Sequence, residues 1–399
     1  MHQTRRRLLL GLGGVLLPLL VGAFVAPGSQ ATAGENRGGS PVPSSLCKRS
    51  ALAMPPLWTG SGAWNGDDLV LIDTVRRRLL PYSADGRARV EPQAPLAKAL
   101  VDLYPTRIAA AGDGRLVVQA DASRFLLMDG GYAKRGDVLA SLLAAQDGSG
   151  STIDKIYTLA LAGQDIVAFA DVKTPGVAGV DRWSTGIVRL YPGKGSFEVL
   201  HNLPRDDVSR KYHRLGYAYI AGLGDTAFYL LMGNGTHLWR HEQGKEPEDL
   251  GDLERFFPLW KKSPALPSYV SAQDFVSVME TAEESSMPTG LYGWKDPASG
   301  QEALYLVSRQ VQNGKTQWLL TKLLPKNGRS AGTVLIRSDA NHLFAVPGPS
   351  QWAIVEKGPA VALQEQEVKN VFILPAEKVR RSFDRPAAQG GKGLSDICQ

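Results

Sequence analysis

The stretch AAGDGRLVVQADASRFLLMDGG, residues Ala110–Gly131, decides the fold class. It contains a turn at GDG, an apolar strand, a two-residue turn and a second apolar strand, and the preceding TRIAAA (Thr106–Ala111) supplies a strand before them. Gly and Asp suit tight reversals of the chain, whereas branched and aromatic residues suit a pleated strand. The stretch therefore predicts three antiparallel strands joined by short turns.

Related turn-and-strand phrases recur along the whole chain, at Ala63–Asp73, Ala160–Asp171, Ala221–Leu231, Ser299–Ser308 and Gly348–Lys357. The turn glycines are spaced by about 46, 51, 61, 76 and 48 residues, which are the periods of propeller blades with insertions. Leucine-rich and helical repeats are shorter or have a helical apolar period. The sequence therefore predicts an all-β fold, a single six-bladed β-propeller with loop insertions.

The amino terminus has the pattern of a targeting segment. TRRR (Thr4–Arg7) precedes an apolar run, Leu8–Ala26, and Ala-Thr-Ala at 31–33 forms an AxA cleavage site. Residues 1–33 are therefore expected to be a signal peptide, and the protein periplasmic or secreted. The arginine pair at 5–6 also resembles a twin-arginine signal, while an ordinary secretory signal and an uncleaved anchor remain alternatives.

The remaining chain is expected to form one domain. Residues 34–46 are rich in Gly, Ser and Pro and are expected to be a flexible leader, followed by the propeller at 47–399. Loss of the signal lowers the formal charge from +6 to about +3, and no basic run is interleaved with aromatic residues. We therefore expect no nucleic-acid binding, no stable membrane span after cleavage, and a monomer.

Two cysteines lie near the two ends of the predicted propeller, at Cys47 and Cys398. The first and last blades of a propeller are neighbours, and an exported protein can keep a disulfide, so we expect these two cysteines to be paired. A lipid-modified Cys47 and an intermolecular disulfide are the alternatives.

Interruptions of the repeat are expected to form the working surface, because ligands bind propellers through loops. Two insertions stand out, Val172–Gly186 and Asp252–Phe275. A third segment, Val138–Ser151, resembles a short helix whose leucines (139, 142 and 143) are expected to cover the propeller. The candidate binding residues are polar or aromatic and lie in or near loops: Asp171, Arg182, Trp183, Asn234, Trp260 and Trp294.

Three early strands end in aspartate, at Asp73, Asp121 and Asp171. Carboxylates from several blades could together bind calcium, but an aspartate before a tight turn usually accepts hydrogen bonds from that turn, and this second interpretation is favoured. His237 and His241 are expected in one strand, too far apart to share a metal. No cofactor is predicted, and calcium is the alternative.

The segments DLVLIDTVRRRLLPYSADG (Asp68–Gly86) and Ala110–Gly131 resemble the superfamily of six-bladed propellers that includes the NHL, YWTD and gluconolactonase-like groups. The resemblance implies a six-bladed ring. Kinship with the gluconolactonase-like group would imply a metal-dependent hydrolase or lactonase, but its Glu/Asn/Asn/Asp metal set cannot be placed on this chain, and no YWTD string occurs.

The sequence lacks GxSxG, HExxH, Walker and Rossmann motifs. It therefore favours an exported, noncatalytic binding or scaffold protein whose loops recognise a protein, an envelope component or a carbohydrate. The alternative is the metal-dependent hydrolase or lactonase, and a quinoprotein-type oxidoreductase is a more distant one.

Overall fold

The computed structural model describes residues 48–50, 52, 56, 61–83, 86–89, 100, 103–111, 114–176, 179–203, 218–223, 226–232, 237–257, 260–261, 285–296, 299–312, 315–336, 338, 340, 342–358 and 368–383. The expected signal peptide (1–33), the leader (34–46) and both cysteines, Cys47 and Cys398, lie outside these residues. None of the helices within these ranges has the length and apolar character needed to cross a membrane.

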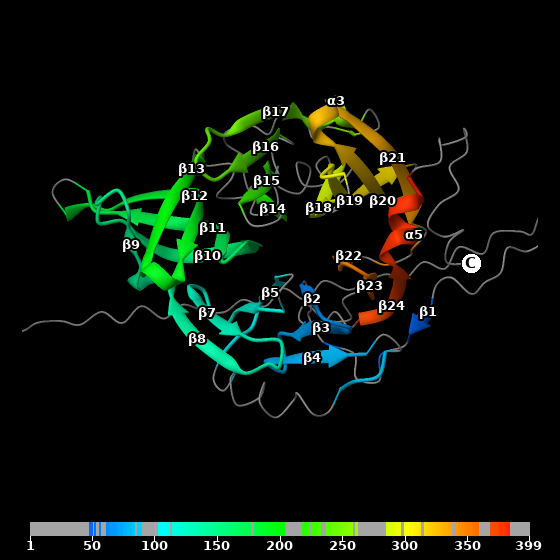
Figure 1. Cartoon of the computed structure of the whole chain (residues 1–399), viewed down its shortest axis with the longest axis horizontal. Helices are drawn as coiled ribbons and strands as arrows, with labels where there is room; N and C mark the ends of the chain where they lie inside the picture. Colours follow the sequence, from blue (N-terminus) through cyan, green and yellow to red (C-terminus); the bar gives the residue numbers. More distant parts are fainter. Residues whose placement is uncertain are drawn as a thin grey trace, which may run out of the picture. The chain divides into compact units, whose positions relative to one another are not determined.

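The strands form six sheets, and within each sheet consecutive strands of a blade pair antiparallel (Figure 1). The first three sheets are β2 (Gly62–Asn65), β3 (Asp68–Asp73) and β4 (Arg78–Tyr82); β5 (Arg107–Ala110), β6 (Leu116–Gln119), β7 (Arg124–Met128) and β8 (Lys134–Leu139); and β10 (Thr152–Ala162), β11 (Asp165–Thr174), β12 (Arg182–Tyr191) and β13 (Ser196–Leu203). A short strand, β9 (Ala144–Ala145), joins the third sheet in parallel with β13.

The remaining three sheets repeat this pattern. They are β14 (Ala218–Leu223), β15 (Ala227–Met232), β16 (His237–Glu242) and β17 (Glu248–Asp252); β18 (Met287–Lys295), β19 (Glu302–Gln312), β20 (Lys315–Leu324) and β21 (Arg329–Ile336); and β22 (His342–Pro347), β23 (Gln351–Lys357) and β24 (Val368–Pro375), which β1 (Lys48–Ser50) completes. The helices are short: η1 (Ala140–Leu142), η3 (Pro192–Lys194), α3 (Leu253–Phe256), η4 (Pro325–Asn327) and α5 (Ala376–Arg381).

The six sheets are blades arranged in a closed ring. The innermost strands contact one another in the cyclic order β2, β5, β10, β14, β18, β22 and back to β2, and Figure 1 shows the blades around a central axis. The protein is therefore a six-bladed β-propeller, as the spacing of the turn glycines predicted. The blades are numbered one to six here in the order of these inner strands.

The ring is closed by strand pairing between the two ends of the described chain. β1 pairs antiparallel with β24, with Lys48 opposite Ile373 and Ser50 opposite Val371, so the amino-terminal strand is the outermost strand of the carboxy-terminal blade. Cys47 directly precedes this strand. The disulfide between Cys47 and Cys398 remains a prediction, because both residues lie outside the described ranges.

All inner strands run in the same direction, which gives the ring two distinct faces. For example, β2 and β5 begin side by side. The Ser61 hydroxyl, just before β2, donates to the carbonyl oxygen of Ile108 in β5 and accepts from the Ile108 N–H. We call the end at which the inner strands begin the proximal face. It also carries the turns between the second and third strands of each blade, because strands alternate in direction. The distal face carries the turns between the first and second strands, which include Gly66, Gly163 and Gly300.

Neighbouring inner strands approach closely at glycines. A methyl group on Gly222 of β14 would collide with the carbonyl oxygen of Leu161 in β10, and one on Gly293 of β18 would collide with the carbonyl oxygen of Gly222. Both neighbours are backbone atoms and cannot rotate away. These two glycines therefore set how tightly blades three, four and five pack around the axis.

The substitution Gly222→Ala is expected to lower the free energy of unfolding by about 1–3 kcal/mol, because the added methyl forces two inner strands apart. Gly193→Ala in η3 is the matched control, since a methyl group there meets no heavy atom within 4 Å. Chemical denaturation of the three proteins checks the difference, and equal stabilities for both variants would contradict the close packing.

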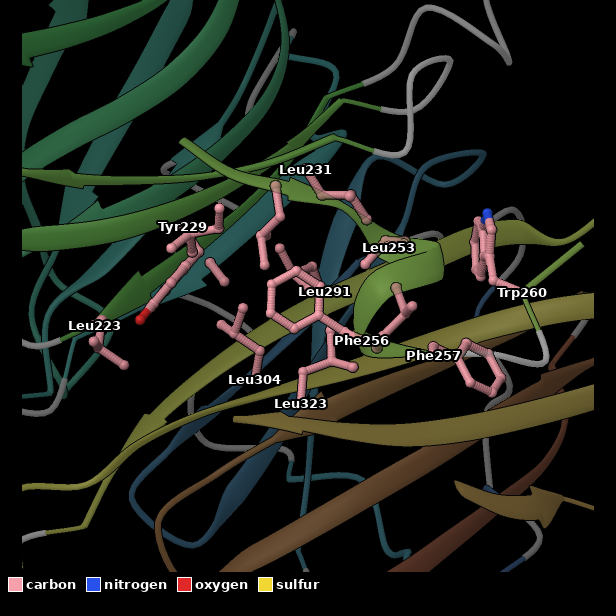
Figure 2. Close-up of a cluster of buried hydrophobic side chains, with 14 of the residues drawn as sticks. Leu223, Tyr229, Leu231, Leu253, Phe256, Phe257, Trp260, Leu291, Leu304 and Leu323 are labelled. Atoms are coloured by element: carbon pink, nitrogen blue, oxygen red, sulfur yellow. The ribbon is translucent and has the colours of Figure 1, made fainter. Parts of the chain in front are cut away.

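The core lies between adjacent blades, and one of its apolar clusters lies between blades four and five (Figure 2). Leu253 and Phe256 of α3, followed by Phe257 and Trp260, pack there with side chains of β15, β19 and β20 such as Tyr229, Leu304 and Leu323. The insertion predicted at Asp252–Phe275 therefore begins as a core-packing segment and not as an open loop. Of the remainder, only residue 261 is described.

The segment Val138–Ser151 departs from its prediction. Its helix is only the single 3-10 turn η1, and of the three leucines only Leu143 is buried. Leu139 is 40% exposed and Leu142 is 78% exposed, so these two side chains do not cover the propeller. The strand predicted for His237 and His241 is confirmed as β16.

Candidate functional site

A channel runs through the ring and is lined by the inner strands of all six blades. Its volume is about 1070 Å³. Most of its wall is made of small or apolar residues, which include Ala63, Ala110, Ala160, Ala221, Gly222, Ile108, Leu161, Leu291 and Phe344. Alanine and glycine at the inner strands keep the centre open, because a larger side chain there would fill it.

The charged residues among the described channel lining are all basic, and they lie with His342 toward its proximal end. Arg107 begins β5, His342 begins β22, and Lys357 and Arg309 lie near the proximal ends of β23 and β19. No Asp or Glu is among the described lining residues. This end of the channel therefore has a positive potential that no carboxylate of its described wall neutralises.

Lys357 is the most unusual member of this group. Side chains alternate along β23, so Ala353, Val355 and Lys357 share the face that packs on blade one. His342 lies directly opposite Lys357 in the strand pair. The lysine is only 6% exposed, yet it has neither a hydrogen bond nor an ion pair with any residue that the structure describes.

The surroundings of Lys357 disfavour its charge. Burial away from water, with a smaller contribution from the nearby Arg107 charge, lowers the pKa of Lys357 from 10.5 to about 8. Arg107 itself donates to the carbonyl oxygen of Thr106 at 3.0 Å and has no acidic partner within the described ranges. The adjacent Thr106 hydroxyl oxygen is buried without a hydrogen-bond partner there. Among the described residues, Lys357 and the Thr106 hydroxyl at this mouth thus have no hydrogen-bond partner in the protein.

Large hydrophobic side chains are exposed around the proximal face. Val75 lies in the β3–β4 turn, and Tyr104, which precedes β5, stacks under Arg77 of that turn at 3.7 Å. Val180 and Trp183 lie at the β11–β12 turn and are 71% and 41% exposed. Leu139 and Leu142 lie on either side of Ala140. The N–H of Ala140 donates to the carbonyl oxygen of Ser123 in the β6–β7 turn, which places both leucines at the proximal face. These six are all of the large hydrophobic residues that are exposed among the described positions.

Three of the predicted binding residues lie at the proximal turn of blade three. Arg182 and Trp183 begin β12 and are exposed. The strand end predicted at Asp171 is wrong, because β11 continues to Thr174 and stays paired with both neighbouring strands beyond Asp171. Asp171 is buried, and its carboxylate accepts hydrogen bonds from the hydroxyls of Tyr157 at 2.7 Å and Thr185 at 2.9 Å. Asp171 therefore links β10, β11 and β12 by hydrogen bonds, beneath the exposed Arg182 and Trp183.

The other predicted binding residues do not join them. Trp260 is 4% exposed and packs beside Phe257, so its ring offers no surface to a ligand. Trp294 lies at the distal end of β18 and is covered by the Arg380 guanidinium at 4.7 Å. Asn234 lies outside the described residues.

The aspartates considered as calcium ligands are engaged in their own turns or blades. Asp73 is fully buried and accepts from the N–H of Arg76 at 2.9 Å and from the guanidinium groups of Arg76 and Arg78. Asp121 is exposed and accepts from the N–H of Ala122 at 2.7 Å. The part of the chain that the structure describes contains no cluster of three or more His, Cys, Asp or Glu residues suited to a metal ion.

No family model and no curated protein sequence matches this chain. Among solved structures, it is similar to a protein of unknown function from Bacteroides thetaiotaomicron, with 13% identity, a TM-score of 0.46 and coverage of 81% of this chain and 70% of that one. It is also similar to a DUF4221 family member from Bacteroides vulgatus (10% identity, TM-score 0.42, 83% and 98%). A third is virginiamycin B lyase from Staphylococcus aureus (10% identity, TM-score 0.40, 82% and 98%). Likeness at this level has no bearing on what this chain binds.

Sequence reasoning missed the basic mouth of the channel. Lys357 ends the phrase GPSQWAIVEK, where a lysine after an apolar strand resembles an ordinary solvent-exposed strand end. The only available signal was that the apolar positions of this strand continue to its last residues, which indicates burial. The exposed Leu139 and Leu142 were also missed, because leucines at helical spacing usually pack inward.

Proposed function

We propose that the protein is an exported, noncatalytic binding propeller that recognises a protein partner through its proximal face. The observation that carries this proposal is the location of the exposed hydrophobic residues. Scattered exposed hydrophobic residues are normal, but here Val75, Tyr104, Leu139, Leu142, Val180 and Trp183 all belong to one face. Exposed apolar side chains favour burial against a partner.

The chemistry of these residues favours a protein over a carbohydrate. Sugars stack on aromatic rings, and among the described residues of this face only Trp183 and Tyr104 expose such rings. The aliphatic side chains of Leu142 and Val180, which are 78% and 71% exposed, are better matched by apolar side chains of a partner protein. Export is supported by the signal pattern of residues 1–33 alone.

Trp183→Ala is expected to weaken partner binding roughly 10- to 30-fold, because a tryptophan in an interface often costs about 1–2 kcal/mol when truncated. To find the partner, we would compare two variants in the envelope fraction of the source cell. One carries a photocrosslinking residue at position 183, and the other carries it at position 194, in η3 on the distal side. A saturable crosslink at 183 alone supports the proposal, and mass spectrometry identifies the partner for affinity measurements.

Lys194→Ala serves as the matched control and should bind the identified partner as the unmodified protein does. Equal crosslinking at positions 183 and 194, or unchanged affinity of the Trp183→Ala variant, would place recognition elsewhere on the molecule.

A further inference from the structure

The channel contains a charge that the protein itself does not compensate. Lys357 is 6% exposed, lines the channel and has no partner among the described residues. Burying a cation without a counterion is costly, and such groups persist mainly at functional sites. A bound anion would supply the missing counterion.

The acidic residues nearest to Lys357 in the sheet architecture are already engaged. Asp73 of β3 belongs to the blade-one face that packs on Lys357, but Arg76 and Arg78 pair with it. Glu356 is adjacent in sequence, but it points to the opposite side of β23 and accepts from Asn370 at 2.8 Å. Arg107 adds a second positive charge, close enough to lower the pKa of Lys357. The electrostatics of this mouth therefore suit an anion.

The rest of the channel narrows the class of ligand. Beyond the basic end, the wall includes Ile108, Leu161, Ile220, Leu291 and Phe344, which have no charge and no hydrogen-bonding side chain. A volume of about 1070 Å³ is in the range of cavities that hold drug-sized molecules. A ligand with a charged head and an apolar body would match both ends of this space.

We propose that the channel is a binding site for an amphiphilic anion, with Lys357 and Arg107 holding a carboxylate or phosphate head and the alanine- and leucine-lined wall holding its apolar body. Arg309 lines the same end of the channel and adds to its positive potential. This site does not rest on the proposed partner binding, because it uses the channel wall and not the exposed residues of the proximal rim.

The proposal is tested by calorimetric titration of the purified full chain with decanoate and decyl phosphate, which carry the two possible heads on one body. Binding of at least one is expected, and the preferred head identifies the source chemistry. Lys357→Met should weaken that binding at least tenfold, since a hydrogen bond to a charged group is lost. Lys295→Met, at the distal end of β18, is the control and should bind like the unmodified protein.

Two other probes, together with the decyl anions and the Lys357→Met variant, define the outcomes that would overturn the proposal. Decyltrimethylammonium binding as tightly as decanoate would refute selection for an anion. Inorganic phosphate binding as tightly as decyl phosphate would refute a role for the apolar wall. Absence of binding by both decyl anions, or unchanged affinity in a folded Lys357→Met variant, would refute the site itself. Trp183→Ala should leave decanoate binding intact, so the channel site and the partner face are tested separately.

Discussion

Replacement of Glu302 with alanine is expected to lower the free energy of unfolding by about 2–4 kcal/mol, because a partly buried guanidinium loses two charge-assisted hydrogen bonds and keeps only Glu242 as a counterion. Glu302 begins β19 in blade five, and its side chain is 4% exposed. Its carboxylate accepts from Nε and Nη2 of Arg240 at 3.1 and 3.0 Å and from the Tyr229 hydroxyl at 2.7 Å. Both donors belong to blade four, so the network joins two blades.

The pH dependence of this contribution follows from the pKa of Glu302. Burial raises that pKa, but the hydrogen bonds from Arg240 and Tyr229 outweigh burial and hold it below the ordinary value of 4.5. The stabilisation is therefore complete above pH 4.5 and is lost as the pH falls below that value. Denaturant titration at neutral pH and at acidic pH measures both effects.

Glu254→Ala provides the control for this substitution, because Glu254 is an exposed carboxylate of α3. Its replacement is expected to change stability by no more than about 0.5 kcal/mol. If Glu302→Ala were as mild as Glu254→Ala, the bridge between blades four and five would contribute nothing to stability.

The second large effect has the opposite sign. Lys357→Met is expected to raise the free energy of unfolding by roughly 2–3 kcal/mol at pH 7, because it removes an unpaired buried charge. Below pH 8 the lysine is charged in both the folded and the unfolded protein, and burial penalises only the folded one. As the pH rises from about 8 to 10.5, the folded protein releases this proton first, so the penalty disappears.

Chemical denaturation of both proteins at pH 7 and pH 10 measures this difference. The advantage of the variant should be largest at pH 7 and much smaller at pH 10. The other charged or titratable groups on the strands around Lys357 are present in both proteins, so their contributions largely cancel in the comparison. They include Arg107, His342 and Asp73. A variant less stable than the unmodified protein at pH 7 would mean that Lys357 has a stabilising partner.

Much of the fold could be predicted from the sequence because turns and strands are local. The GDG turn after TRIAAA and the apolar runs after it correspond to β5, β6 and β7. The turn chemistry of Asp73 was also predictable, because its hydrogen bond to Arg76 spans three residues. The number of blades followed from repetition of the same local signal.

The site could not be predicted to the same extent, because it depends on contacts between distant segments. Lys357 is buried only because blade six packs on blade one, and its effect on the channel depends on Arg107 from blade two. The burial of Trp260 also depends on contacts between distant segments. This residue follows a short helix in an apparent loop, yet it is buried between blades four and five. Burial of such residues is decided by closure of the ring, which no local pattern encodes.

The pairing of β1 with β24 also constrains how the protein is made. Translation produces Lys48 before the strands of every blade, whereas its partner Ile373 lies in β24, the last strand of the sixth blade. A nascent chain can form successive hairpins, but β1 has no partner strand until β24 has been synthesised. Chains truncated before residue 368 lack the partner strand altogether, and they expose an open blade edge of the kind that promotes aggregation. Synthesis of β24 is thus the step that allows the ring to close.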